Sequence, residues 1–360
     1  MMATGRIERT FTFAPGMTPK IVARNPSGVI DVQGEAREDV AVLVTCDPAD
    51  ALERGLEVRI EQQGDTVRVE TKWPHMLGGL RTFKARVTME IRVPRMSAVN
   101  ADLASGEARI TGIEGDVRVN NASGDIRVND VRGLIGVNTA SGDIRMSDTH
   151  GTTRVHTASG EVVVERGMGQ FAFETASGDI RLDSLIGTLE VNTASGDVTA
   201  NGSAFVRAKV KAVSGDVSLA TPLDPHGDYH FQTVSGDVSL LVPEHTALTL
   251  TYSTLSGDVS AALPMQREGG KRSGTLIVNG GGVPVRMSSV SGDCLVRAAR
   301  SSLPALPLMD AVNPFISPAS TEATLPEEMA SSETLRVLQA VERGELSIDE
   351  AMDRLSTVEE

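Results

Sequence analysis

Aromatic side chains are scarce in this sequence, and basic residues are outnumbered. The 360 residues include eight Phe, two Tyr and one Trp, and 48 Asp and Glu stand against 34 Lys and Arg, a net charge of −14. Nucleic-acid recognition needs a basic surface and, for single strands, aromatic side chains on which bases stack. Anionic lipid surfaces likewise attract basic segments. The composition therefore argues against nucleic acid and against an anionic membrane as partners.

Cysteines and long apolar runs are also few. Cys46 and Cys294 alone cannot form a disulfide framework, which favours free thiols in a reducing compartment. The N-terminus reads MMATGRIERTFTF and lacks the apolar run of a secretory signal. No stretch approaches the roughly 18 apolar residues of a transmembrane helix. We therefore expect a cytoplasmic protein without a transmembrane segment; export by an unrecognised route is the alternative.

Glycine is abundant, with 35 residues, and much of it belongs to one repeated motif. Ser-Gly-Asp or Ser-Gly-Glu occurs ten times, with its serine at Ser105, Ser123, Ser141, Ser159, Ser177, Ser195, Ser214, Ser235, Ser256 and Ser291. The first five intervals are 18 residues, and 19, 21, 21 and 35 follow. A degenerate copy at Ser273 divides the last interval into 17 and 18. This regularity predicts a protein of stacked repeats.

Apolar residues recur at fixed positions within each repeat. With the motif serine as zero, they occupy positions +3, +5, +12 and +14, so that their spacings run 2, 7, 2, 7; the repeat of Ser177 has Ile180, Leu182, Leu189 and Val191 there. A spacing of two is typical of a strand with one buried face. Each repeat then holds two short strands and two turns, one at the motif and one ending at the glycine of position +10.

Stacking such repeats buries the apolar faces that one repeat leaves exposed. We therefore predict an all-β fold, a parallel β-solenoid in the form of a two-sided β-helix with about 18 residues per coil. Ile144 and Ile180 should be buried, and the degenerate copy should form a coil with Leu276 and Val278 in its core. A three-sided hexapeptide helix and nine-residue antiparallel hairpins are the alternatives.

The acidic residue of the motif has a structural and a metal-binding interpretation. Calcium-binding β-rolls carry Gly-Gly-x-Gly-x-Asp in every turn, whereas this chain has one acid per repeat. Position +4 is often arginine, as in Arg109, Arg127, Arg145 and Arg181, but becomes Thr or Ser after Ser195. Since stacked like charges repel unless compensated, we predict a ladder of paired acids and arginines, with no cofactor and no resident metal.

Catalytic residues are not expected, because the acids are spread evenly along the repeats instead of gathering as unlike groups in one place. His226 and His230 flank Asp228 and form a weak candidate metal site, with a polar loop as the simpler interpretation.

These patterns divide the chain into four segments. Residues 1–98 predict an N-terminal β segment that caps the solenoid, with a faint copy of the motif turn at Asn25–Val32. Residues 99–298 hold the Ser-Gly-Asp repeats, and residues 299–331 form a Pro-rich linker. Residues 332–360 predict a helical hairpin.

The predicted hairpin has an apolar stripe too small to form a core of its own. We expect it to bind a protein partner or to self-associate through Leu335, Leu338, Ile348, Met352 and Leu355.

The strands around Asn138–Met146 and Asn192–Val198 resemble the bacterial putative-adhesin family of β-strand repeats, a domain of unknown function, over roughly residues 25–298. Residues 335–355 resemble the short SHOCT-like helical module that accompanies this family. The resemblance implies a non-catalytic role linked to the cell envelope. We therefore predict a structural and interaction protein, not an enzyme: a rigid scaffold with a tethered docking or oligomerisation module. The alternatives are a surface adhesin stabilised by calcium and a carbohydrate-active β-helix enzyme.

Overall fold

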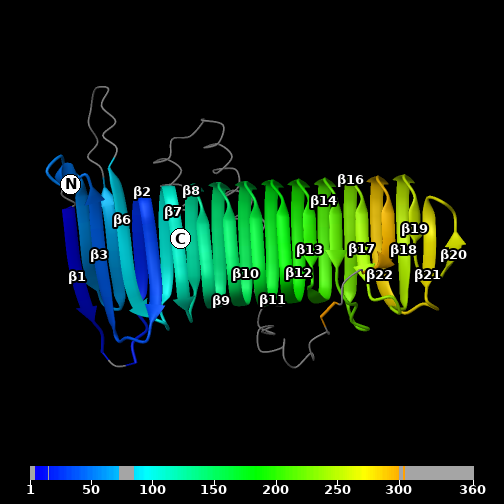
Figure 1. Ribbon diagram of the computed structural model, residues 1–360, viewed down its shortest axis with the longest axis horizontal. Coiled ribbons are helices and arrows are strands. Elements are labelled where there is room, and N and C mark those ends of the chain that lie inside the picture. Colours follow the sequence, from blue (N-terminus) through cyan, green and yellow to red (C-terminus); the bar gives the residue numbers. More distant parts are fainter. Residues whose placement is uncertain (1–4, 15, 73–84, 300–302, 305–360) are drawn as a thin grey trace, which may run out of the picture. The chain divides into compact units, whose positions relative to one another are not determined.

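The computed structural model describes residues 5–14, 16–72, 85–299 and 303–304, which form 23 strands and one short 3-10 turn (Figure 1). They fall into two compact units that divide between Arg145 and Met146. Within the described ranges, no helix has the length and apolar character needed to span a membrane.

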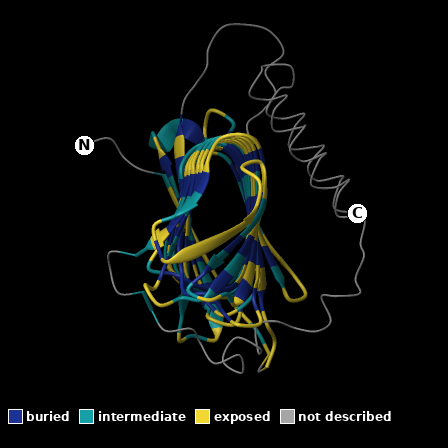
Figure 2. Cartoon of the chain, turned by 90° about the vertical axis from the view of Figure 1, so that its right-hand side faces the viewer, coloured by how far each residue is buried: buried dark blue, intermediate teal, exposed yellow. Residues whose placement is uncertain are grey.

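Both units are built from the coil that the repeat predicts. β11 (Val162–Ser177) pairs in parallel with β12 (Ile180–Ser195), with Val162 opposite Ile180 and Ser177 opposite Ser195, an offset of one repeat. The predicted core columns are confirmed, because Ile180, Leu182, Leu189 and Val191 are all at most 2% exposed, and Ile144 is fully buried. Buried and exposed positions alternate along the strands (Figure 2).

Each coil bends at two corners, and both require special backbone conformations. At the motif corner Gly196 has φ 120°, and a Cβ there would lie 2.3 Å from the carbonyl oxygen of Gly178 in the neighbouring coil. At the second corner Gly187 has φ 138°, and its Cβ would lie 1.8 Å from the carbonyl oxygen of Gly169. In these coils glycine is therefore needed at both corners, for its positive φ and for the close approach of stacked backbones. The next coil has Phe205 opposite Gly187, so the second corner does not keep its glycine along the whole chain.

The first unit contains the strands that begin the chain. They are β1 (Gly5–Thr12), β2 (Lys20–Glu35), β3 (Asp39–Asp47), β4 (Glu57–Gln63), β5 (Thr66–Lys72), β6 (Arg86–Pro94), β7 (Ala98–Ile113), β8 (Val117–Ser123) and β9 (Ile126–Ser141), with the 3-10 turn η1 (Ala49–Ala51) after β3. β2 is a coil of the stack, since it pairs in parallel with β7 and places Ser27 opposite Ser105. The faint motif copy at Asn25–Val32 is thereby confirmed.

The first unit does not stack its coils in chain order. β5 and β6 together pair with β2 in parallel, so that β2 lies between them and β7 although it precedes both in the sequence. Antiparallel strands then cover this outer layer: β4 pairs with β5, β3 with β6, and β1 with β3. An antiparallel cover shields the open edge that a parallel stack would otherwise present.

The second unit continues with the same coil. Its strands are β10 (Ile144–Ser159), whose first two residues belong to the first unit, β11, β12, β13 (Val198–Asn201), β14 (Ala204–Ser214), β15 (Val217–Ala220), β16 (Asp228–Ser235), β17 (Val238–Val242), β18 (Leu248–Ser256), β19 (Val259–Ala261), β20 (Met265–Gly269), β21 (Ser273–Val278), β22 (Val283–Ser291) and β23 (Cys294–Ala298).

Here too one coil is out of order. β22 pairs in parallel with β16 and with β18, so that Ser291 lies opposite both Ser235 and Ser256. The coil of Ser291, last in the sequence, therefore lies between two coils that precede it, and in Figure 1 the orange β22 separates yellow-green strands.

The predicted coil at Ser273 is wrong. Residues Ser273–Val278 form β21, which runs antiparallel to β18 and pairs with β20 in a hairpin. Leu276 and Val278 are buried as expected, but as residues of this hairpin and not of a coil. Gly274 lies opposite Tyr252 and is not among the glycines with positive φ, so the chain makes no motif corner there.

The predicted fold class, which included a helical hairpin, is also corrected. The part of the chain that the structure describes is all-β, with one 3-10 turn and no α-helix. Residues 332–360, to which the hairpin was assigned, lie outside the described residues.

Candidate functional site: the Ser-Gly-Asp corner

The motif corner brings the repeated acids into one row. In the second unit the motif aspartates form a row in which the backbone N–H of each one after Asp179 donates to Oδ1 of the aspartate in the preceding coil. The row runs Asp179 to Asp197 at 2.9 Å, then Asp216, Asp237, Asp293 and Asp258 at 2.8 Å each. It follows the spatial order of the coils, including the inserted coil of Ser291. The five carboxylates from Asp179 to Asp293 therefore each satisfy a backbone N–H at the corner, and a charged acceptor makes that bond a strong one. Asp258 ends the row as a donor only.

Arginine compensates the acids in the earlier coils, as the sequence predicted. Arg109 pairs with Glu107 at 2.6 Å, Arg127 with Asp125 at 3.3 Å and Arg145 with Asp143 at 3.2 Å. Arg127 also contacts Glu107, so the ladder links neighbouring coils. In the second unit Arg181 reaches Glu161 at 2.7 Å. Among the described residues, the six aspartates of this row have no ion pair, and five of them, all but Asp258, accept a backbone hydrogen bond instead. The sequence predicted the arginines but missed those bonds.

We expect the fold to form without calcium. All motif acids except Asp258, at the end of the row, already have arginine or backbone N–H partners, so a cation is not needed to hold the row together. Addition of a calcium chelator to the purified protein should leave its far-UV circular dichroism spectrum unchanged, and calcium should not shift its unfolding midpoint. Loss of the β signal in chelator would show that the acids serve a calcium site.

A second polar column stands three residues before the motif serine in the first unit. Arg24 donates to Asp102 at 3.1 Å, Asn120 donates to Asp102 at 3.0 Å, and Asn138 donates to Asn120 at 2.8 Å. Arg24 also approaches the largely buried Glu70 at 3.6 Å. These side chains link successive coils. The recurring asparagine of the motif was the only signal in the sequence.

The position just before the motif serine changes character along the chain. The first four motif coils carry buried alanine there, since Ala104, Ala122, Ala140 and Ala158 are 2–7% exposed. The next two coils also carry alanine, but Ala176 is half-buried and Ala194 is exposed. Four later coils carry large exposed apolar residues instead, Val213 (54% exposed), Val234 (44%), Val290 (46%) and Leu255 (63%). Their motif serines pair in the order Ser214, Ser235, Ser291, Ser256, so the four side chains belong to consecutive coils. We call these four residues the apolar ridge.

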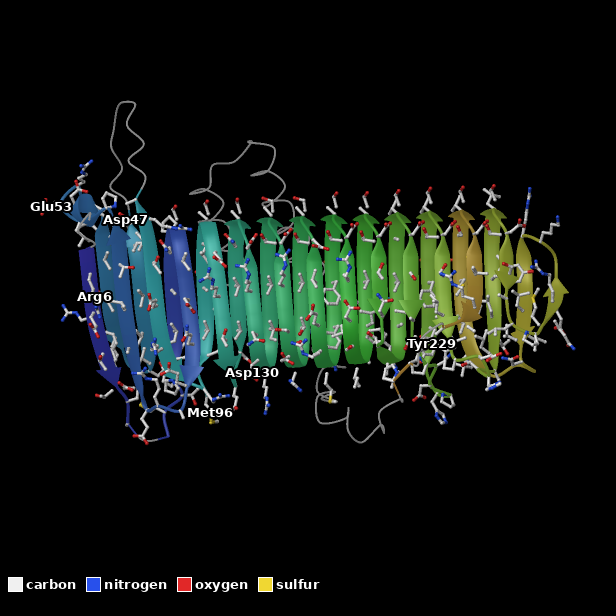
Figure 3. All side chains as sticks on the ribbon, viewed as in Figure 1. Arg6, Asp47, Glu53, Met96, Asp130 and Tyr229 are labelled. Carbon is white, nitrogen blue, oxygen red and sulfur yellow. The ribbon has the colours of Figure 1, made fainter. Side chains whose placement is uncertain are left out.

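The candidate histidines do not form a metal site. His226 has an 87% exposed side chain and only approaches Asp224 at 3.8 Å. Its loop is held by Tyr229, labelled in Figure 3, whose buried hydroxyl donates to the Phe205 carbonyl at 2.6 Å and accepts from the Asp224 N–H at 2.8 Å. Burial raises the pKa of Tyr229. No group of three or more metal-ligating side chains occurs within the described ranges.

The five residues predicted to bind a partner are not placed by the structure. Leu335, Leu338, Ile348, Met352 and Leu355 lie outside the described residues.

Comparison with known proteins adds a family and several solved structures. The family model described as Toastrack DUF4097 matches residues 27–297. A putative cell adhesion protein from Clostridium sporogenes is 10% identical, with 82% of this chain and 100% of that chain covered and a TM-score of 0.24. A putative lipid binding protein from Parabacteroides distasonis is 11% identical, and a putative adhesin from Parabacteroides merdae is 12% identical; both comparisons cover 82% of this chain and 97% of that chain with a TM-score of 0.38. No curated protein matches the sequence.

Proposed function

The chain belongs to the Toastrack DUF4097 family, and from this premise we propose that it is a non-catalytic structural protein whose stacked coils bind other macromolecules, as an adhesin does. The observation that carries the proposal is the use of the motif acids. They are the most frequent reactive groups along the coils. In their row they accept hydrogen bonds from the backbone of the next coil or pair with arginines, so they are used to hold the structure together. Their regular spacing suits a surface that is recognised over several coils.

Photo-cross-linking tests whether the coils contact a partner. We would place a photoreactive amino acid at exposed Gln62 in β4 and at exposed Gln232 in β16, one in each unit. Irradiation of cells that naturally produce the protein should yield covalent adducts with another macromolecule from at least one position, and unirradiated cells should yield none. Release of reducing ends from a polysaccharide by the purified protein, lost in Asp197→Asn, would identify an enzyme instead and contradict the proposal.

Cell fractionation addresses where this binding takes place. Recovery in the cytoplasmic fraction would agree with the location expected from the sequence, and recovery at the cell surface would agree with a role in adhesion.

A further inference from the structure

The apolar ridge lies beside a part of the acidic row that has no arginine at position +4. This position holds Ser218, Ser239, Leu295 and Ser260 in the four ridge coils, whereas four of the six earlier motif coils hold arginine there. Asp216, Asp237, Asp293 and Asp258, three residues after the ridge residues, are all exposed. In the four ridge coils the residue before the motif serine is Val or Leu, and the acid has no ion pair with a described residue. The acid lost its ion pair earlier along the chain, since the coil of Ser195 already has Thr199 at position +4 while it keeps Ala194 before the serine.

Neither feature is required by the coil. Earlier coils form the same corner with alanine before the serine and with arginine after it, so the fold tolerates both patterns. Large aliphatic side chains that stay exposed in consecutive coils also leave more apolar surface in water than alanine would, which is unfavourable. These residues are therefore better explained by a ligand than by the stability of the coil.

The dimensions of the ridge match one turn of an α-helix per coil. Neighbouring strands lie about 4.8 Å apart, close to the 5.4 Å pitch of an α-helix. Four consecutive coils span about 15 Å, the length of roughly three helical turns. A helix with apolar residues at i, i+3 or i+4, and i+7 can lay them between the ridge side chains, as helices do in apolar grooves.

Charge selects among the possible occupants. Residues 321–360 of this chain contain eleven acidic and three basic residues, so this segment would be repelled by the acidic row. Anionic lipid would be repelled for the same reason. A second copy is disfavoured because it would bring its own acidic row against this one. Exposed Lys211 precedes Val213, and the carbonyl of exposed Arg272 accepts from Thr254 beside Leu255, so these cations stand at the two ends of the ridge, against four aspartates along it.

We propose that the apolar ridge and the aspartates beside it bind a basic amphipathic helix of a partner protein. The apolar face of the helix packs on Val213, Val234, Val290 and Leu255, and its Lys or Arg residues on one flank face the aspartates. This inference rests on the proposed binding function and names one surface that performs it.

A designed peptide tests the surface directly. The probe is a labelled 18-residue helix-forming peptide with Leu at i, i+3, i+4 and i+7 and Lys on one flank; a scrambled peptide of equal composition is its control. In fluorescence anisotropy the wild-type chain should bind the probe more tightly than the scrambled peptide. The variant Val213→Ala/Val234→Ala/Val290→Ala/Leu255→Ala should lose about tenfold or more in affinity.

Two further variants test the charge of the surface and its position on the chain. Asp216→Asn/Asp237→Asn/Asp293→Asn keeps the Oδ1 acceptor of the backbone bonds and should weaken binding and flatten its salt dependence. Met96→Ala/Leu134→Ala, which trims exposed apolar residues of the first unit, should leave the affinity unchanged. Circular dichroism and thermal unfolding should be the same for all variants, so that a loss of binding is not a loss of fold.

Several results would overturn the inference. They are equal affinity of the wild-type chain and the four-alanine variant, equal affinity for the scrambled peptide, or no binding at millimolar probe. Ridge-dependent binding to neutral phosphatidylcholine vesicles without binding to the probe would reassign the surface to lipid. If the probe fails while Gln62 or Gln232 still gives protein adducts, this inference fails and the proposed function stands.

Discussion

Gly124→Ala should lower the free energy of unfolding by roughly 2–6 kcal/mol. Gly124 has φ 117°, and an added Cβ would lie 2.1 Å from the carbonyl oxygen of Gly106 in the neighbouring coil. The backbone strain of about 1–3 kcal/mol adds to about 1–3 kcal/mol for forcing stacked chains apart. Urea unfolding of the purified variant followed by circular dichroism measures the loss.

Gly136→Ala in β9 is the matched control. The nearest atom to its added Cβ is Arg118 Cγ at 4.0 Å, and Gly136 is not among the residues with positive φ. Its effect should stay within about 1 kcal/mol of wild type, since alanine restricts the unfolded chain as much as it affects the native one. Similar losses in both variants would mean that glycine is not needed for close stacking at the corner.

Ile180→Ala should cost about 2–5 kcal/mol of unfolding free energy, because it opens a cavity in a column that has no solvent access. Ile180 is 1% exposed and lies in register between Val162 and Val198 of the neighbouring coils. Packing on both sides limits how far the coils can collapse into the space, so the loss should lie in the upper part of that range. Thermal and urea unfolding of the variant measure it.

Arg181→Ala, one residue further along β12, tests the opposite face of the same strand. Its side chain is 52% exposed and pairs with Glu161 at 2.7 Å. An exposed ion pair contributes under about 1 kcal/mol, so this variant should unfold close to the wild-type midpoint. A loss comparable to that of Ile180→Ala would contradict the assigned orientation of the strand.

The coil itself could be predicted from the sequence because its determinants are local. Apolar residues two apart mark each strand, and a glycine marks each corner, so Ile180, Leu182 and Gly187 were assigned correctly without any knowledge of their neighbours. The arginines at position +4 likewise indicated the ion pairs with the motif acids at position +2, since residues two apart on a strand share one face.

The second corner was recognised only in part. Its glycine at position +10 was predicted, but the left-handed residue three positions earlier was not, because it varies from coil to coil: Gly112 (φ 72°), Asp130 (φ 50°), Asp148 (φ 54°), Arg166 (φ 52°), Ser184 (φ 59°) and Gly202 (φ 55°). Because several residue types adopt this backbone conformation here, no single residue type holds the position throughout and the sequence carries no signal for it.

The stacking order was decided by tertiary structure alone. All coils present the same apolar columns, so the motif of Ser235 can pair with Ser291 as well as with Ser256, and nothing in the repeat distinguishes them. The end strands make the difference: the hairpin of β20 and β21 covers the coil of Ser256, and the returning chain enters between two coils. An exposed parallel edge is unfavourable wherever it occurs, which explains why each unit has one coil out of chain order. The apolar ridge follows from that order, since Val234, Val290 and Leu255 become neighbours only when the last coil is inserted between the two before it. The sequence alone determined the coil and its two faces, and long-range pairing of interchangeable coils determined which surfaces lie side by side.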